Sequence, residues 1–245
     1  MVYTKEIFKS ELLNNSAGIN AEMLTDETVD KLYTVCEELD RCSKQFNLTA
    51  ITEPDEVLKK HIIDCLFLAD LVGKMADGEF SLIDVGSGAG FPSLPLAAAL
   101  PDGKITALDS TAKKIGYIKA TSEKMGVSDF TAVAARAEEA ARGEMRESFD
   151  FACARAVARL AVLMELCVPF IREGGYFISM KAAAAEEEVK EAESAAKKLG
   201  MKFDRMIPYT IADLPDKRFL VIYKKISKTN SLYPRNFSQI SKKPL

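Results

Sequence analysis

The stretch LIDVGSGAGFP, Leu82–Pro92, joins an apolar run to three glycines spaced as G-x-G-x-G. An apolar run of this length that ends in glycines predicts a buried strand followed by a sharp turn, at which the backbone can approach a ligand closely. In an open parallel sheet the ligand lies beyond the carboxyl ends of the strands. The stretch therefore predicts a binding loop after the first strand of such a sheet. An acid, Asp84, lies two residues before the first glycine.

The sequence around this stretch predicts a doubly wound α/β fold. Short β-rich runs alternate with helical patterns, which favours parallel strands with crossover helices. Two further strand-like runs, KFDRMIPYTI and RFLVIYKKI, are separated by only ADLPDK, so they should pair antiparallel. The prediction is a mostly parallel sheet of seven strands that ends in an antiparallel hairpin. The first five strands are expected near 81–85, 104–109, 130–134, 149–154 and 175–180, and the helices near 92–99, 111–125, 136–145, 157–172 and 183–199.

Three regions are expected along the chain: a helical N-terminal extension over residues 1–75, a sheet domain over 76–230, and a basic C-terminal tail over 231–245. The start lacks the basic and apolar regions of a signal peptide, and no run has the apolar length of a membrane span. The five cysteines form no C-x-x-C pair, which favours reduced thiols in a cytoplasm and no metal site.

The second strand ends at Asp109, 23 residues after Gly86. A carboxylate there can accept both hydroxyls of a ribose, so the ligand is predicted to contain adenosine. Asp84 would repel a pyrophosphate in the partly desolvated loop. It suits S-adenosylmethionine better, because this cofactor carries a sulfonium and an ammonium group. The other interpretation of Asp84 is a structural acid that is hydrogen bonded to backbone amides.

Residues 217–245 contain eight basic side chains and no acid, so the preceding 216 residues carry a net charge of −11. Tyr223, Tyr233 and Phe237 lie among these cations. Aromatic rings beside cations are suited to single-stranded RNA, and this favours an RNA contact over a merely solubilising tail.

Several stretches resemble the bacterial 16S ribosomal RNA guanine-N7 methyltransferases, also called the glucose-inhibited division protein B family. The glycine loop resembles the S-adenosylmethionine-dependent methyltransferases in general. The more specific stretches are FNLTAITEPDEVLKKHIIDCL (46–66), ARAEE (135–139), ARAVARLAVLMELCVP (154–169) and YPRNFSQISKKPL (233–245). The resemblance implies a Rossmann-like class I methyltransferase fold and methylation of guanine N7 in 16S ribosomal RNA or the small ribosomal subunit, by a protein expected to be a monomer.

The resemblance also implies roles for single residues. Together with the loop chemistry it predicts cofactor contacts from Asp84, Gly86, Gly88, Gly90, Phe91, Asp109, Ser110, Thr111, Ala137, Glu138 and Arg155. Contacts with RNA are predicted for Asn47, Arg159, Lys181, Lys225, Arg235, Lys242 and Lys243, and Arg155 is suited to either a cofactor carboxylate or an RNA phosphate. No catalytic residue is assigned. His61, Asp64 and Arg155 are the candidates, with Thr49 a further substrate-side residue, and a packed histidine is the alternative interpretation of His61.

Guanine N7 carries a free lone pair in the ring plane, so its methylation requires alignment with the methyl donor and no general base. The sequence has ARAVAR where methyltransferases of exocyclic amines commonly have an Asp/Asn-Pro-Pro-aromatic box, and Cys153 fits a buried position. N7 faces the deep, narrow major groove of A-form RNA, so the target should be unpaired or flipped out. Three alternatives stay open: a small-molecule methyltransferase, a nicotinamide-dependent oxidoreductase, and a non-catalytic RNA-binding protein.

Overall fold

The computed structural model describes residues 3–43, 48–155 and 158–245. A single seven-stranded sheet runs through its centre, in the order β3-β2-β1-β4-β5-β7-β6. The strands from β1 to β5 are parallel, and β7 lies antiparallel to both β5 and β6. The predicted fold is therefore confirmed. The strands are β1 (Phe80–Val85), β2 (Gly103–Asp109), β3 (Phe130–Ala134), β4 (Phe149–Arg155), β5 (Ile171–Lys181), β6 (Met201–Tyr209) and β7 (Arg218–Lys225).

The central strands β1, β2 and β4 are mostly buried on both faces because helices cover the sheet from both sides, as parallel sheets require. Along β1, Leu82 faces one hydrophobic cluster and Ile83 faces the other. The same alternation continues across the sheet: Cys153 and Ile178 belong to the first cluster, and Ala152 to the second. A strand with this two-sided burial is expected to have a nearly continuous apolar sequence, which residues 82–85 show apart from Asp84.

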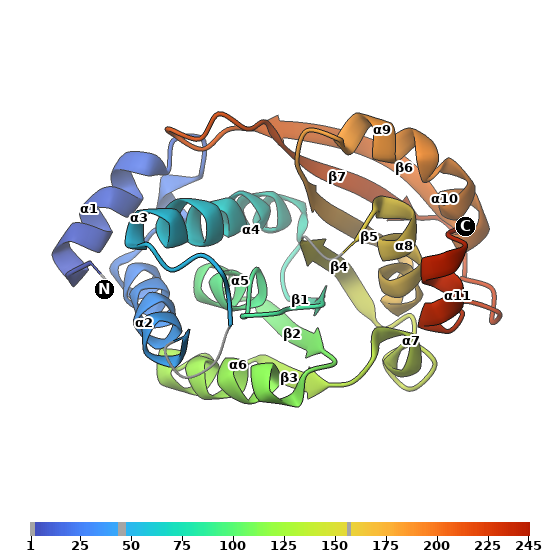
Figure 1. The fold of residues 1–245 in the computed structure, drawn as a ribbon, viewed down its shortest axis with the longest axis horizontal. Coiled ribbons are helices and arrows are strands. Elements are labelled where there is room, and N and C mark those ends of the chain that lie inside the picture. The colour runs from blue at the N-terminus through green and yellow to red at the C-terminus, as the bar shows by residue number, and fades with distance from the viewer. Residues whose placement is uncertain (1–2, 44–47, 156–157) are drawn as a thin grey trace.

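The N-terminal helices cover the first face together with α5 (Ser93–Ala99) and α6 (Ala112–Met125) (Figure 1). The N-terminal helices are α1 (Lys5–Asn15), the 3-10 turn η1 (Ala21–Met23), α2 (Asp26–Ser43), α3 (Pro54–Val57), the π-helical turn η2 (Leu58–Ile63) and α4 (Asp64–Met75). The predicted apolar stripe of α2, which includes Val29, Leu32 and Leu39, is buried. Phe8 and Leu66 lie in one cluster with strand residues such as Ile105. The extension therefore packs directly on the sheet.

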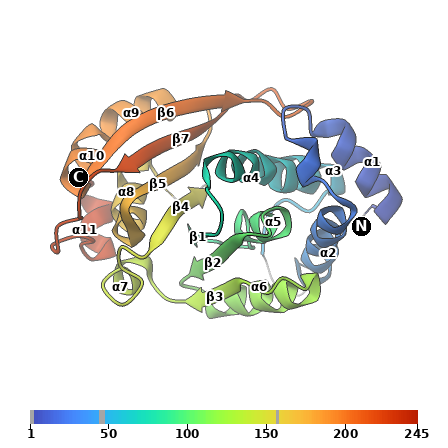
Figure 2. The same ribbon diagram turned by 180° about the vertical axis from the view of Figure 1, so that it is seen from behind.

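The C-terminal helices cover the second face, as the reverse view shows (Figure 2). They are α8 (Leu160–Cys167), the 3-10 turn η3 (Val168–Phe170), α9 (Ala185–Glu191), α10 (Glu193–Leu199) and α11 (Phe237–Lys242), with the single turn α7 (Ala137–Ala140) near α8. The predicted helix over 183–199 is interrupted at Ala192, and the one expected over 136–145 is a single turn. Beyond that turn, Arg146 donates hydrogen bonds to the carbonyls of Thr229 and Tyr233.

The tail is packed against the second face. Ile240 of α11 is fully buried in the second cluster, and Arg142 donates a hydrogen bond to the carbonyl of Pro234. The two ends of the chain lie toward opposite ends of the long axis (Figures 1 and 2). Within the described residues no helix has the combination of length and apolarity that a membrane span demands.

Candidate active site

A cavity of about 550 Å³ opens at the carboxyl ends of β1, β2 and β4. The strand order changes direction between β1 and β4, so the cavity lies at the topological switch point where ligands of such sheets bind. Its volume is in the range of sites for molecules of cofactor size. The predicted residues that line it are Gly86, Gly88, Phe91, Asp109, Ser110, Ala137, Glu138, Arg155 and His61.

The glycine loop turns through three left-handed residues, with φ of 81° at Gly86, 58° at Gly88 and 86° at Gly90. A side chain at these positions would be strained. At Gly90 a Cβ atom would also collide with Leu94 of α5, so this glycine permits the close packing of loop and helix. Gly90 is not among the residues that line the cavity, whereas Gly86 and Gly88 are.

Asp84 lies behind the loop and does not line the cavity. Its side chain is fully buried. Oδ2 accepts the backbone N–H of Ser93 at 3.1 Å, and Oδ1 has no hydrogen-bond partner among the described residues. Burial raises the pKa of this carboxyl to about 6. Asp84 thus matches the alternative interpretation of a structural acid that is hydrogen bonded to a backbone amide, because its carboxylate does not border the cavity.

Asp109 occupies the position expected of a ribose-binding carboxylate. Its Oδ2 accepts the N–H of Gly88 at 3.0 Å, and its Oδ1 accepts the N–H of Thr111 at 2.8 Å. Each carboxylate oxygen keeps a further lone pair, so two ribose hydroxyls can still be accepted. Thr111 itself precedes α6 and does not line the cavity. Ala137 and Glu138 follow β3 and form the adjoining wall.

Arg155, the last residue of β4, connects the cavity to the N-terminal helices. Its Nη1 donates to the carbonyl of Lys60 at 2.7 Å and to Oδ2 of Asp64 at 3.2 Å, and its Nη2 donates to Nδ1 of His61 at 2.9 Å. A π-helical turn leaves backbone carbonyls without their usual partners, and π turns are frequent at functional sites. Here η2 presents the Lys60 carbonyl and the His61 ring to the same guanidinium. Contacts with the described residues use three of the five N–H groups of Arg155, which leaves two that could donate to an anion.

His61 is neutral and has no free lone pair. A guanidinium only donates, so Nδ1 of His61 accepts from Arg155 and the ring proton resides on Nε2. Nε2–H then donates to Oγ1 of Thr49 at 3.1 Å. Burial, and secondly the charge of Arg155, lowers the pKa of His61 to about 3. The ring stacks on Phe91 with 4.5 Å between centroids. In this arrangement His61 holds other groups in place and cannot act as a general base.

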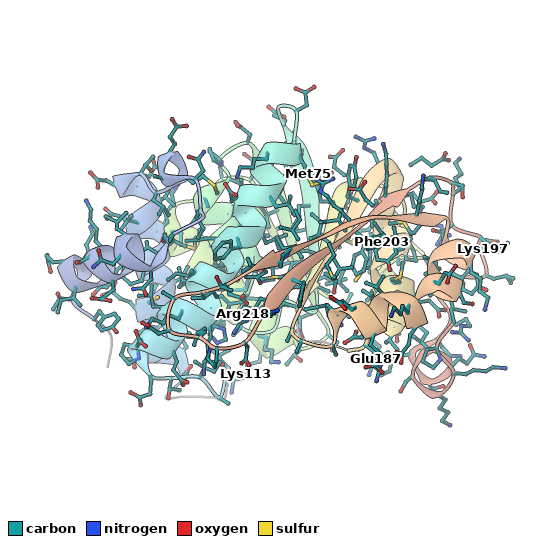
Figure 3. The ribbon with its side chains drawn as sticks, turned by 90° about the horizontal axis from the view of Figure 1, so that it is seen from above. Met75, Lys113, Glu187, Lys197, Phe203 and Arg218 are labelled. Carbon is teal, nitrogen blue, oxygen red and sulfur yellow. The ribbon has the colours of Figure 1, made fainter. Side chains whose placement is uncertain are left out.

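Asp64 is 2% exposed and connects three distant elements. Besides Arg155 it accepts the hydroxyl of Tyr209 at 2.8 Å and Nη1 of Arg218 at 3.1 Å. Figure 3 shows Arg218 on the hairpin beside the N-terminal helices. The carboxylate does not line the cavity, so it fixes Arg155 from behind.

Residues 28–213 match the family model described as rRNA small subunit methyltransferase G. A relative of that name from Clostridium botulinum (strain Loch Maree / Type A3) is 43% identical over 206 residues, which cover 83% of this chain and 84% of the relative. Another from Ligilactobacillus salivarius (strain UCC118) is 40% identical over 244 residues and covers 99% of both chains. The chain belongs to this family. The resemblance seen in the sequence is thus confirmed.

Solved structures with similar folds have sequences that are distant from that of this chain. The S-adenosylmethionine-dependent O-methyltransferase of Thermotoga maritima has a TM-score of 0.53 and 16% identity, and covers 80% of this chain and 72% of its own. The TYW2 protein of M. jannaschii, solved with AdoMet (S-adenosylmethionine), has a TM-score of 0.53 and 14% identity over 66% of this chain and 77% of its own. At these identities the likeness shows the fold.

Three of the cations that were predicted to bind RNA have structural partners within the protein. Lys225 is 1% exposed and donates to the carbonyls of Val168 and Ile171 and to Oγ1 of Thr229. Burial lowers the pKa of Lys225 to about 8. Lys181 is paired with Glu188 at 2.8 Å, and its side chain is 9% exposed. The side chains of these two lysines point into the interior, because successive residues of a strand face opposite sides of the sheet. Carboxylates or carbonyl groups compensate their positive charges.

Arg235 makes a two-pronged contact with Glu165, whose side chain is fully buried. Its guanidinium therefore anchors the tail to α8. Arg159 is exposed and pairs with Glu191 at 2.5 Å. Lys242 and Lys243 are exposed on or next to α11, and Asn47 lies outside the described residues. Tyr223, one of the rings expected beside RNA, is 1% exposed and packs in the core.

Other residues at the site were not predicted from the sequence. Lys114 and Arg136 line the cavity, and the available signal was their place just after the ends of β2 and β3. Tyr209 and Arg218 reach Asp64 across more than 140 residues of sequence, and no local pattern marks that contact. Phe237 of α11, which was predicted from the sequence only as a ring beside RNA, is 44% exposed and also lines the cavity, so the tail contributes an aromatic ring to its mouth.

Proposed function

We propose that this protein transfers a methyl group from S-adenosylmethionine to N7 of a guanine in 16S ribosomal RNA. The family supports the class of reaction and of substrate. The observation that carries the proposal is the cavity at the switch point. At the end of β2 it holds the carboxylate of Asp109, which can bind a ribose. At the end of β4 it holds Arg155, whose hydrogen bond to His61 leaves the histidine without a nitrogen lone pair that could act as a base.

The residues present fit the cofactor. Asp109 would hold the ribose hydroxyls through the lone pairs that its backbone contacts leave free, and Ala137 and Glu138 would border the adenine. Gly86 and Gly88 present backbone without side chains to the cavity, so the methionine part can approach it closely there. When bound, the cofactor supplies an activated methyl group on a sulfonium. Ser110, Phe91 and Arg155 also line this space, and Arg155 offers two N–H groups to a carboxylate or a phosphate.

The side chains around the cavity suit a nucleophile that needs no deprotonation. Nδ1 of His61 accepts from Arg155, and its Nε2 is protonated, so the ring cannot remove a proton from a substrate. N7 of guanine attacks with its own lone pair, and the role of the protein is alignment of N7 with the methyl carbon and sulfur. Thr49, His61 and Phe91 form the wall next to which the base would lie.

The mouth of the cavity is suited to an unpaired nucleotide. Phe237 offers an exposed ring on which a base can stack, and Arg136 and Lys114 offer charges to a phosphate. Among the residues predicted to bind RNA, Lys242 and Lys243 keep exposed positions near this mouth, and Arg159 and Asn47 stay predictions. We place the reaction in the cytoplasm, where ribosomal RNA and reduced thiols occur together, since all five cysteines are free and buried. We further propose that the protein acts as a monomer.

Mass mapping of methylated guanines in 16S ribosomal RNA tests this function, in cells with and without the gene. We expect one N7-methylguanine to disappear with the gene and to return with the wild-type protein. Gly86→Asp should fail to restore it, because a side chain at φ of 81° strains the loop and fills the cavity. Purified protein should bind S-adenosylmethionine and not NAD in calorimetric titration. Methylation of a metabolite with RNA left unmodified would reject the proposal in favour of a small-molecule enzyme.

A further inference from the structure

Thr49 belongs to the segment between α2 and α3 and forms part of the cavity wall. Its hydroxyl oxygen lies 3.1 Å from Nε2 of His61 and 3.1 Å from the backbone nitrogen of Ile51. A threonine hydroxyl has one hydrogen to donate and two lone pairs that accept, and it ordinarily adapts to whatever partner it meets. In this protein the surrounding groups remove that freedom.

The chain of hydrogen bonds that begins at Arg155 fixes each proton in turn. Arg155 has only N–H donors, so Nδ1 of His61 accepts and Nε2 carries the hydrogen. Nε2–H occupies one lone pair of the Thr49 oxygen, and the N–H of Ile51 occupies the other. No described residue accepts the hydroxyl hydrogen of Thr49. The remaining direction leads into the cavity, so Thr49 presents a hydrogen-bond donor there and cannot also accept.

This arrangement is held rigidly. The His61 ring is 7% exposed and stacks on Phe91 at an interplanar angle of 17°. The pKa of His61, lowered to about 3 chiefly by burial, keeps the ring neutral across the physiological range. The donor direction of Thr49 is therefore constant at every pH at which the enzyme would work.

The position of Thr49 in the cavity wall places its hydroxyl on the side where the substrate base would lie. Asp109 ends β2 and Glu138 follows β3, whereas Arg155 ends β4 on the other side of β1. A cofactor whose ribose and adenine occupy the β2–β3 side leaves the β4 side, with His61 and Thr49, for the guanine. The edge of guanine that carries N7 has one other acceptor, O6, whereas adenine has an amino donor in its place. N7 must keep its lone pair for the methyl group, so O6 is the atom on this edge that a donor can read.

We propose that the Thr49 hydroxyl, aimed by His61 and Arg155, donates a hydrogen bond to O6 of the target guanine and selects guanine over adenine. This rests on the proposed guanine-N7 activity. Thr49 acts as a specificity residue, because an oxygen with both lone pairs engaged cannot accept from the amino group of adenine. His61 and Arg155 are positioning residues, since they act through Thr49.

The test compares two small-subunit RNAs that differ only at the mapped target nucleotide, guanine in one and 2-aminopurine in the other. 2-Aminopurine keeps N7 and the 2-amino group but lacks O6. For the wild-type protein, single-turnover methylation of guanine should exceed that of 2-aminopurine. Thr49→Val should reduce this ratio about tenfold, the value of one hydrogen bond. Thr49→Ser should keep the wild-type ratio. The intrinsic difference in reactivity between the two bases cancels when the ratios of the variants are compared.

Inosine, which keeps O6 and N7 but lacks the 2-amino group, is the matched substrate control and should respond to Thr49→Val as guanine does. Calorimetric binding of S-adenosylmethionine establishes that each variant is folded. An unchanged guanine to 2-aminopurine ratio in a folded Thr49→Val protein overturns the inference. Absence of guanine methylation by the wild-type protein would instead reject the proposed function, so the two failures are distinguishable.

Discussion

Asp84 is an ionisable residue in the centre of the molecule, and its burial makes stability depend on pH. The unfolded chain loses this proton near 3.8, whereas burial raises the pKa in the folded state to about 6. Between those pH values the native state binds more protons, so its stability falls as pH rises. A shift of about two pKa units corresponds to roughly 3 kcal/mol, which is fully lost above pH 6.

Asp84→Asn does not titrate, so we expect its free energy of unfolding to increase relative to wild type by roughly 2 kcal/mol between pH 4 and pH 7. Urea unfolding at several pH values measures this difference, from which the titrations of all other groups cancel. Asp77→Asn, at an exposed position, is the matched control and should run parallel to wild type. A constant difference between Asp84→Asn and wild type would contradict the prediction.

The site residues that the sequence predicted best are those within a few residues of a strand end. Gly86, Gly88 and Asp109 were found because the loop after a parallel strand has a fixed place relative to the ligand. The sequence did not reveal that Arg155, His61 and Thr49 share hydrogen bonds, because that contact joins segments about 95 residues apart. It also assigned Lys225 and Tyr223 to an RNA surface, because charge counting ignores which face of a strand a residue occupies.

At the scale of single elements, the docking of the tail depends on one buried acid. Oε1 and Oε2 of Glu165 accept from Nε and Nη2 of Arg235, and Glu165 is fully buried. Removal of one partner of such a pair leaves a buried charge without compensation, which costs more than the loss of an exposed pair.

We expect Arg235→Ala to lower the free energy of unfolding by roughly 3 kcal/mol in urea denaturation. Arg235→Lys, which keeps the charge and loses the two-pronged contact, should lose less. Lys242→Ala is exposed on the neighbouring helix and should leave stability unchanged. A stable Arg235→Ala protein whose only defect is weaker RNA binding would contradict the structural role and return Arg235 to the RNA surface.

The elements themselves were largely predictable, and the exceptions have local causes. Apolar periodicity located the buried stripe of α2 and all seven strands. It did not predict the π turn of η2, because the residues over 58–63 continue a helical pattern and the turn is stabilised by a tertiary contact, the Lys60 carbonyl with Arg155. The segment after α7 is likewise determined by contacts of Arg146 with the tail.

At the scale of the whole molecule, the cavity is assembled from three parts of the chain. The sheet contributes the loop and Asp109, the N-terminal extension contributes Thr49 and His61, and the tail contributes Phe237. The extension and the sheet share one hydrophobic cluster, so the position of His61 relative to the loop is determined by packing. The sequence pattern suggests a boundary at residue 75 between the extension and the sheet domain, but the residues on the two sides of this boundary share one hydrophobic core.

The distribution of basic residues over the molecule determines which of them can act on RNA. Of the eight cations in residues 217–245, Arg218, Lys225 and Arg235 have buried or half-buried acidic partners. Lys242 and Lys243 are exposed and belong to the end of the molecule where Phe237 lines the cavity. Lys202 and Lys224 are also exposed and lie opposite each other on β6 and β7, and neither lines the cavity.

These positions make a matched experiment possible, because both lysine pairs change the net charge equally. Replacement of Lys242 and Lys243 by Ala should weaken binding of small-subunit RNA and reduce the slope of log affinity against log salt concentration by about 1.4. This corresponds to about 0.7 for each phosphate contact with single-stranded RNA. Replacement of Lys202 and Lys224 by Ala should leave the slope unchanged. Filter binding over a series of salt concentrations measures both. If the slope falls by the same amount in both double variants, RNA binding depends on net charge alone, and the tail does not direct RNA to the cavity.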